Sequence, residues 1–131
     1  MKNLLTTLLI IVLTSTFGLA QVTHSGSWIE KSYEVEGKWE IVKKGEQYVL
    51  KFDNDFDTKK APDLKIFLSK LPSNQVTAKN AAKGTALVSE LKEYEGKQEF
   101  VIPKSLSISD YKTLLIHCEQ YGVLWSIADL N

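Results

Sequence analysis

Short segments in which apolar and polar residues alternate follow one another along most of the chain. The alternation has a period of two residues, which is the period of a β-strand. Glycine, proline and asparagine separate the segments at short intervals and indicate turns. The clearest segments are 38–42, 48–52, 64–68, 86–91 and 99–102. The pattern predicts an all-β fold: a single antiparallel β-sandwich of about seven to nine strands.

Two details of this pattern are specific enough to test. The segments 86–91 and 99–102 lie on either side of a Gly96-Lys97 turn, so they are expected to pair as a hairpin. Residues 73–83 have the only helical composition in the chain, over a short and weakly patterned stretch.

The last part of the chain reads as two strands joined by a turn. Leu114 to Cys118 and Val123 to Ala128 are apolar runs, and Gln120-Tyr121-Gly122 separates them. Because side chains alternate between faces, Cys118 shares a face with Leu114 and Ile116, and His117 shares the other with Leu115 and Glu119. The cysteine is therefore expected in or at the edge of the core, where a buried structural role is the simplest interpretation.

The N-terminal residues 1–20 have the form of a secretory signal peptide. Lys2 precedes an apolar stretch at 4–13, and Gly18-Leu-Ala20 places small residues before cleavage at Gln21. The apolar stretch is too short to span a membrane, so no stable membrane insertion is expected after cleavage. The alternative is an anchor that stays uncleaved. Export implies a periplasmic, cell-surface or secreted protein, with 21–26 as a loose polar lead-in and 27–131 as the domain.

Composition narrows the classes of partner. The 131 residues include sixteen lysines, no arginine and sixteen acidic residues, and removing residues 1–20 leaves a formal charge of −1. Without arginine or a basic stripe, neither a nucleic acid nor an anionic membrane surface is an expected partner. Cys118 is the one cysteine, which excludes an internal disulfide and marks a reactive thiol or an intermolecular pair.

The sequence gives little support for a catalytic site or a metal site. His117 adjoins Cys118 but points to the opposite face, and His24 lies in the lead-in, so no catalytic group is assembled and an enzyme is not expected. One cysteine and two histidines are too few for a zinc site, so no metal is expected. The run 53–57 offers alternate carboxylates, but it lacks the later EF-hand ligands and favours a polar turn.

Two binding alternatives stay open. Haem has no covalent attachment motif here, although Cys118 or His117 could ligate it noncovalently. The domain is also rich in tryptophan and tyrosine, most of which should be core. Any that are exposed would form a platform for stacking sugars, which is the basis for a non-catalytic binding or adhesion module.

Several segments together resemble the electron-transfer DM-thirteen domain. Its most specific marks are the Pro62-Asp63-Leu64 step and a strand-borne Cys118 followed by an aromatic residue and a final Ala-x-Leu. The matching segments are 37–41, 48–52, 61–68, 87–91, 96–103 and 115–130. Ala61 stands where a glycine is usual and Trp125 where phenylalanine is common.

The resemblance implies an exported β-sandwich whose characteristic cysteine has a redox role. Cys118 is then the redox or cofactor-binding candidate, with Asp63, His117, Tyr121 and Trp125 as supporting candidates. An electron donor or acceptor would be a separate partner protein, and the cofactor is undetermined. The competing hypothesis is a module that binds glycan or protein and in which Cys118 is a core residue.

Overall fold

A computed structural model describes residues 19–130 of the chain. The strands, in chain order, are β1 (Gln21–Ser27), β2 (Ile29–Glu30), β3 (Val35–Glu36), β4 (Lys38–Lys44), β5 (Gln47–Phe52), β6 (Asp57–Thr58), β7 (Leu64–Ser69), β8 (Ala86–Glu90), β9 (Gln98–Ile102), β10 (Thr113–Cys118) and β11 (Val123–Asp129). Two short 3₁₀ helices, η1 (Ser73–Gln75) and η2 (Ile108–Asp110), complete the elements.

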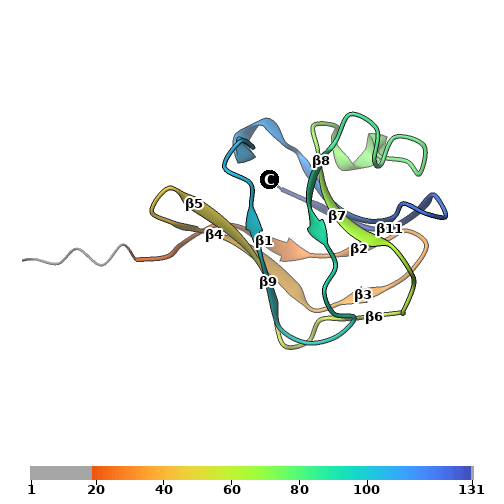
Figure 1. The fold of residues 1–131 in the computed structure, drawn as a ribbon, viewed down its shortest axis with the longest axis horizontal. Coiled ribbons are helices and arrows are strands. Elements are labelled where there is room, and N and C mark those ends of the chain that lie inside the picture. The colour runs from red at the N-terminus through yellow and green to blue at the C-terminus, as the bar shows by residue number, and fades with distance from the viewer. Residues whose placement is uncertain (1–18, 131) are drawn as a thin grey trace, which may run out of the picture.

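The strands form two main sheets that pack against each other (Figure 1). One sheet has the order β1-β4-β5-β9 and the other β2-β11-β10-β7-β8, while β3 and β6 form a small pair. All of the pairings are antiparallel. The expected all-β, antiparallel β-sandwich is confirmed, with eleven strands, three of them only two residues long.

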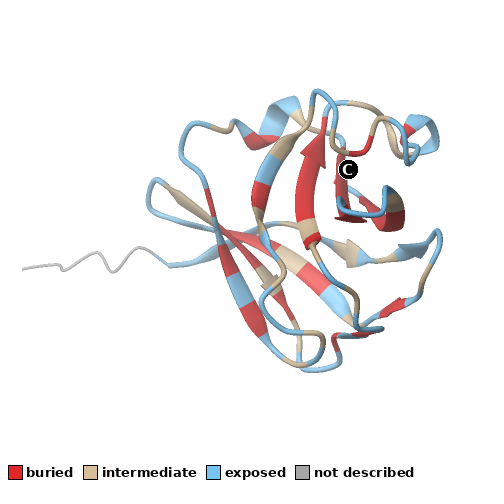
Figure 2. Cartoon of the chain, turned by 45° about the vertical axis from the view of Figure 1, so that its right-hand side comes forward, coloured by how far each residue is buried: buried red, intermediate tan, exposed pale blue. Residues whose placement is uncertain are grey.

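The main core lies between the sheets and is built from the inward residues of each strand. Trp39 and Ile41 of β4 face it from one sheet, and Leu114 and Ile116 of β10 face it from the other, each no more than 1% exposed. Phe52 lies among other rings, with Phe100 at 5.2 Å between centroids. Along β9 buried and exposed residues alternate strictly, and Figure 2 marks the buried residues of the chain in red. The period-two pattern therefore identified the core-facing positions.

A second, smaller core covers the outer face of the five-stranded sheet. Phe67 of β7, Leu115 of β10 and Ile127 of β11 pack there against Val76 and Ala81 of the connection after β7. As a result, all six residues of β10 are buried, on both faces. β10 lies between β11 and β7 in its sheet and has a core on each of its two faces.

The connection that covers this face is not helical beyond one turn. Residues 73–83 were expected to have helical character, but only η1 (Ser73–Gln75) is helical. Asn80 holds the rest as a loop, since its side chain accepts from the Thr77 amide and donates to the Gln75 carbonyl. Such local bonds from asparagine compete with helix formation.

The expected hairpin of 86–91 with 99–102 is wrong. β8 pairs with β7 in one sheet, whereas β9 pairs with β5 in the other, so the chain crosses between the sheets. The Gln98 side chain holds this crossing by bonds to both backbone groups of Glu93. A turn residue at Gly96 marks a reversal, but it does not decide which sheet receives the next strand.

Residues 21–26, expected to be a loose lead-in, belong to strand β1 and pair with β4. β1 is an edge strand with little burial, so its sequence has no apolar alternation to reveal it. Gly26 allows the indole of Trp39 to approach, because an added Cβ would lie 3.1 Å from that ring. Of the expected signal peptide 1–20, residues 1–18 lie outside the described residues.

Within residues 19–130, no helix is long and apolar enough to cross a membrane.

Candidate functional site

Cys118 is the last residue of β10 and lies in the main core. Its side chain is 1% exposed and packs in the same cluster as Leu114 and Ile116, as the alternation predicts. The thiol donates a hydrogen bond to the backbone carbonyl of Pro62, with 3.2 Å between Sγ and oxygen. The sulfur is therefore held in place by the loop that precedes β7.

The Pro62-Asp63 step forms the second attachment of that loop to β10. Asp63 has a φ of 59° and is the one described residue other than glycine in the left-handed region. Its carbonyl accepts the Glu119 amide at 3.2 Å, next to the bond between Pro62 and Cys118. The unusual backbone of Asp63 thus lets two successive carbonyls reach two successive residues of the β10 end.

The Asp63 side chain makes an ion pair with Lys65. Lys65 lies between two carboxylates, with its Nζ 2.7 Å from Glu119 Oε2 and 3.2 Å from Asp63 Oδ1. Glu119 first, and Asp63 second, raise the pKa of Lys65 above its usual range through these bonds. The ion pairs stay partly exposed, so their role is to orient the loop and the start of the turn after β10.

A pocket of about 250 Å³ lies beside Cys118. Its walls come from the loop before β7, the turn after β10 and the chain after β2; they are Tyr33, Lys59, Lys60, Ala61, Pro62, Cys118, Tyr121, Val123 and Trp125. Two of these residues are lysines and none is acidic. Tyr121 is 65% exposed at the turn.

One wall of the pocket is a fixed pair of rings. Tyr33 stacks on Trp125 with 3.9 Å between ring centroids. The Trp125 Nε1 donates to the Thr58 hydroxyl at 2.8 Å, and that hydroxyl donates to the Glu34 carbonyl at 2.9 Å. Lys59 places its ammonium 5.3 Å from the Tyr33 ring centroid. The wall is therefore preorganised by stacking, hydrogen bonds and a cation–π contact.

His117 lies on the opposite face of β10, near Phe67, with ring centroids 6.3 Å apart. It is 3% exposed, and its Nδ1 is buried without a hydrogen-bond partner in the structure. Burial lowers the pKa of His117, although Glu119, Asp63 and the Val123 carbonyl oppose the shift. His117 therefore does not face the Cys118 pocket and is not placed to act as a base for the thiol.

The five residues singled out from the sequence separate into three groups. Cys118, Tyr121 and Trp125 line one pocket. Asp63 lies behind its wall and positions the loop, while His117 belongs to the other face of the sheet.

Sequence reasoning missed Tyr33, Lys59 and Lys60, which line the pocket, and Thr58, which accepts the hydrogen bond from the Trp125 indole. The two lysines directly precede the Ala61-Pro62-Asp63 segment, so adjacency to that motif was an available signal. Tyr33 carried no such signal, because its stacking on Trp125 joins distant parts of the chain.

The pocket does not fit haem. Its volume of about 250 Å³ is below even the roughly 300–1,000 Å³ typical of small-molecule pockets. The thiol already donates a hydrogen bond to the Pro62 carbonyl, and His117, the other ligand expected for haem, lies on the far face of the sheet. Nor do the residues 19–130 contain a group of three or more His, Cys, Asp or Glu side chains placed to hold a metal ion.

A larger pocket, of about 530 Å³, lies on the sheet of β1, β4, β5 and β9. Glu40, Lys51 and Glu99 are among its lining residues, and Lys51 pairs with Glu99 at 3.4 Å. It contains none of the five candidate residues. Cys118, Tyr121 and Trp125 are instead among the lining residues of the smaller pocket.

Comparison with known families gives one match. A family model described as Electron transfer DM13 matches residues 28–130, which is most of the chain. No curated protein and no solved structure matches the chain significantly.

Proposed function

The chain belongs to the Electron transfer DM13 family, and from this membership and the pocket beside Cys118 we propose an exported electron-transfer accessory protein whose redox group is the Cys118 thiol. Family membership supports a redox role in general terms. The thiol assignment, the export and the partner are our proposals. The signal-like residues 1–20 support export to an oxidising compartment, where thiol redox chemistry takes place.

The observation that carries the proposal is the position of Cys118. The residue is only 1% exposed, yet it is among the residues that line a pocket of about 250 Å³. Such a thiol is shielded from large disulfides but open to a molecule small enough to enter the pocket. Lys59 and Lys60 line the same pocket and give its lining a positive charge.

Because only a small molecule can enter the pocket, the reaction that fits is two-electron oxidation of the Cys118 thiol by a peroxide. The Cys118 thiolate attacks one peroxide oxygen, so an S–O bond forms and the O–O bond breaks. The leaving hydroxide keeps its own hydrogen, takes the former thiol proton and departs as water when the oxidant is hydrogen peroxide. Cys118 becomes a sulfenic acid and has transferred two electrons to the oxidant.

A low-molecular-weight thiol returns the electrons. The first thiol condenses with the sulfenic acid to form a mixed disulfide and water, and a second thiol releases Cys118 and leaves as the small disulfide. A separate redox partner protein keeps the small thiol reduced. The domain itself therefore needs no second cysteine.

The test is to treat the exported protein with hydrogen peroxide in the presence of dimedone, a small reagent that traps sulfenic acids. We expect one dimedone adduct on Cys118 by mass spectrometry, and none in Cys118→Ser. A bulky maleimide should label the thiol only after unfolding. Absence of the adduct from the native protein, with one formed after unfolding, would contradict the redox proposal.

The second candidate function is a glycan- or protein-binding module. It is favoured by the burial of Cys118 among core residues and by the exposed ring of Tyr121. In that case a glycan array should give a specific ligand whose affinity is unchanged in Cys118→Ser and lost in Tyr121→Ala.

A further inference from the structure

The pocket beside Cys118 combines flat apolar walls with positive charge. Tyr33, Tyr121 and Trp125 contribute rings, and Ala61, Pro62 and Val123 contribute aliphatic surface. The Tyr33–Trp125 stack is held by the bond from Trp125 to Thr58, so this wall exists before any ligand enters. A preformed aromatic wall favours a planar apolar group, because little ordering is needed on binding.

The positive charge of the lining indicates that the ligand also carries an anionic group. Lys59 and Lys60 are both exposed lining residues, and no carboxylate lines the pocket. Neither lysine makes an ion pair among residues 19–130, whereas Lys65 nearby is paired with two carboxylates. Two ammonium groups without a carboxylate partner, beside an apolar space, favour an anion attached to a ring.

The size of the pocket limits the ligand to one or two fused rings. About 250 Å³ is slightly below the range of roughly 300–1,000 Å³ that drug-sized molecules occupy. Larger planar groups, haem included, are too big for it.

We propose that this pocket binds a small aromatic carboxylate, with the ring among Tyr33, Tyr121 and Trp125 and the carboxylate at Lys59 and Lys60. The inference deepens the proposed function, and rests on it in one respect: the bound ring occupies the space through which an oxidant reaches the Cys118 sulfur. Binding therefore shields the thiol from oxidation.

The binding test uses 2-naphthoate and the full chain as purified after export, labelled with ¹⁵N. The indole N–H signal of Trp125 should shift and saturate, while those of Trp28 and Trp39, which lie outside the pocket, should not. The neutral analogue 2-naphthamide should bind about tenfold more weakly, because it carries no negative charge to pair with the two ammonium groups. Lys60→Gln should weaken naphthoate binding by a similar factor.

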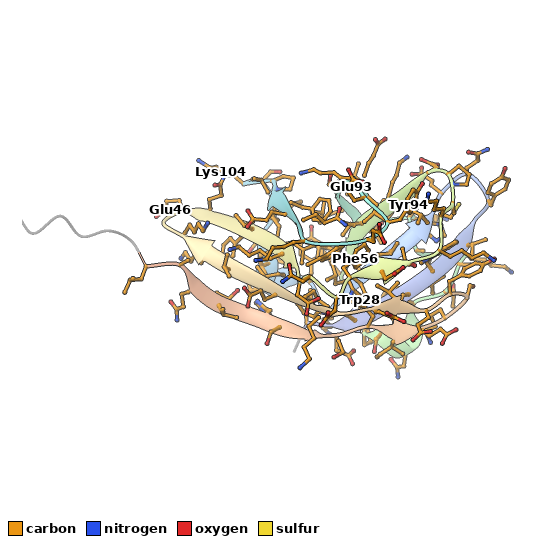
Figure 3. All side chains as sticks on the ribbon, turned by 90° about the horizontal axis from the view of Figure 1, so that it is seen from below. Trp28, Glu46, Phe56, Glu93, Tyr94 and Lys104 are labelled. Atoms are coloured by element: carbon orange, nitrogen blue, oxygen red, sulfur yellow. The ribbon has the colours of Figure 1, made fainter. Side chains whose placement is uncertain are left out.

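Lys104→Gln is the matched control. Lys104 is also an exposed lysine, but it follows β9 and lies at the end of the molecule near Glu46 (Figure 3). This variant should bind naphthoate like the parent protein. Equal binding of naphthoate and naphthamide, together with no effect of Lys60→Gln, would overturn the charge assignment and with it the proposal.

Shielding is measured separately, as the rate of Cys118 oxidation by peroxide. With 2-naphthoate at ten times its Kd, the rate should fall about elevenfold, as mass action requires for mutually exclusive occupancy. An unshifted Trp125 signal in a protein whose Cys118 still forms the dimedone adduct would overturn this inference and leave the redox function standing. A shifted Trp125 signal in a protein whose Cys118 forms no dimedone adduct would overturn the redox function and leave the binding of the aromatic carboxylate standing.

Discussion

Trp125 and Thr58, 67 residues apart in the chain, are joined by a buried hydrogen bond of 2.8 Å from the indole Nε1 to the threonine hydroxyl. The same hydroxyl donates to the Glu34 carbonyl, so it connects β11, β6 and the chain before β3. The stacked Tyr33 adds a second link between the same parts. This bond therefore ties the aromatic wall of the Cys118 pocket to the small β3–β6 sheet.

The substitution Thr58→Val should destabilise the protein by about 1–3 kcal/mol, because it leaves a buried indole N–H and a carbonyl unpaired. The matched control is Thr85→Val, since the Thr85 hydroxyl is buried without a partner in the structure. That variant should be neutral or stabilising. Urea denaturation measures both, and equal losses in the two variants would show that the Thr58 hydrogen bonds contribute little.

Asp63 should tolerate only residues that accept a left-handed backbone. Asp63→Asn keeps that tolerance and should change the free energy of unfolding little, whereas Asp63→Val should cost roughly 1–2 kcal/mol or more. The loss in Asp63→Val should also raise the dimedone labelling rate of Cys118, because the loop carrying Pro62 loosens. A Val variant as stable as the Asn variant would contradict the importance of this backbone conformation.

The neutral form of His117 should stabilise the fold only above mildly acidic pH. Burial puts its pKa in the folded chain below the ordinary value of 6.5. The unfolded chain therefore binds a proton first as the pH falls, so stability drops progressively below about pH 6.5 and no further once the pH passes the folded-state pKa. The charged groups nearby are Lys65 on β7, Glu119 after β10 and Asp63 in the preceding loop.

Urea denaturation at pH 7.5 and 5.5 measures this effect. His117→Leu should lose less stability between the two pH values than the parent, and at the higher pH it should be at least as stable, since an unpaired buried nitrogen is removed. His24, whose pKa burial also lowers, contributes in the same direction. His24→Gln is therefore the comparison, and an unchanged slope in His117→Leu would refute the assignment to His117.

Gly37 and Gly84 form a test of steric need at two positions of similar backbone. Both have positive φ, at 88° and 68°. A Cβ on Gly37 would lie 2.5 Å from Asp53 Oδ1 and 2.7 Å from the Phe56 nitrogen, whereas Gly84 has open space. Gly84→Ala should cost roughly 1–2 kcal/mol from backbone strain alone, and Gly37→Ala should cost clearly more. Thermal denaturation ranks them, and the reverse order would contradict the contacts around Gly37.

The sequence predicted the strands and their faces where one face of the strand meets a core. Alternation placed Cys118 with Leu114 and Ile116, and His117 on the opposite side, and the structure agrees. The same reasoning missed β1, because an edge strand with little burial has no apolar period. The same reasoning wrongly predicted that β8 pairs with β9, because turn residues between two strands do not determine which sheet the second strand enters.

The candidate site was predictable only in part for a related reason. Cys118, Tyr121 and Trp125 lie within or next to one hairpin, so local pattern brought them together. Tyr33 and Lys59 reach the pocket through stacking and a cation–π contact, which depend on how distant segments pack. The alternation of apolar and polar residues along the chain carries no information about contacts between such distant segments.

The double burial of β10 has a consequence for how its pairing register is chosen. Usually a slip by one residue is prevented because it would move apolar side chains into water. In β10 both faces are dry, so such a slip would exchange the sides of Cys118 and His117 at little hydrophobic cost. Polar contacts at its two ends therefore fix the register. The Thr113 hydroxyl donates a hydrogen bond to the Leu71 carbonyl, and the Lys65 ammonium donates to the Glu119 carboxylate. Directional hydrogen bonds at the two strand ends, more than the burial of apolar surface, therefore fix Cys118 on the face of β10 that meets the main core.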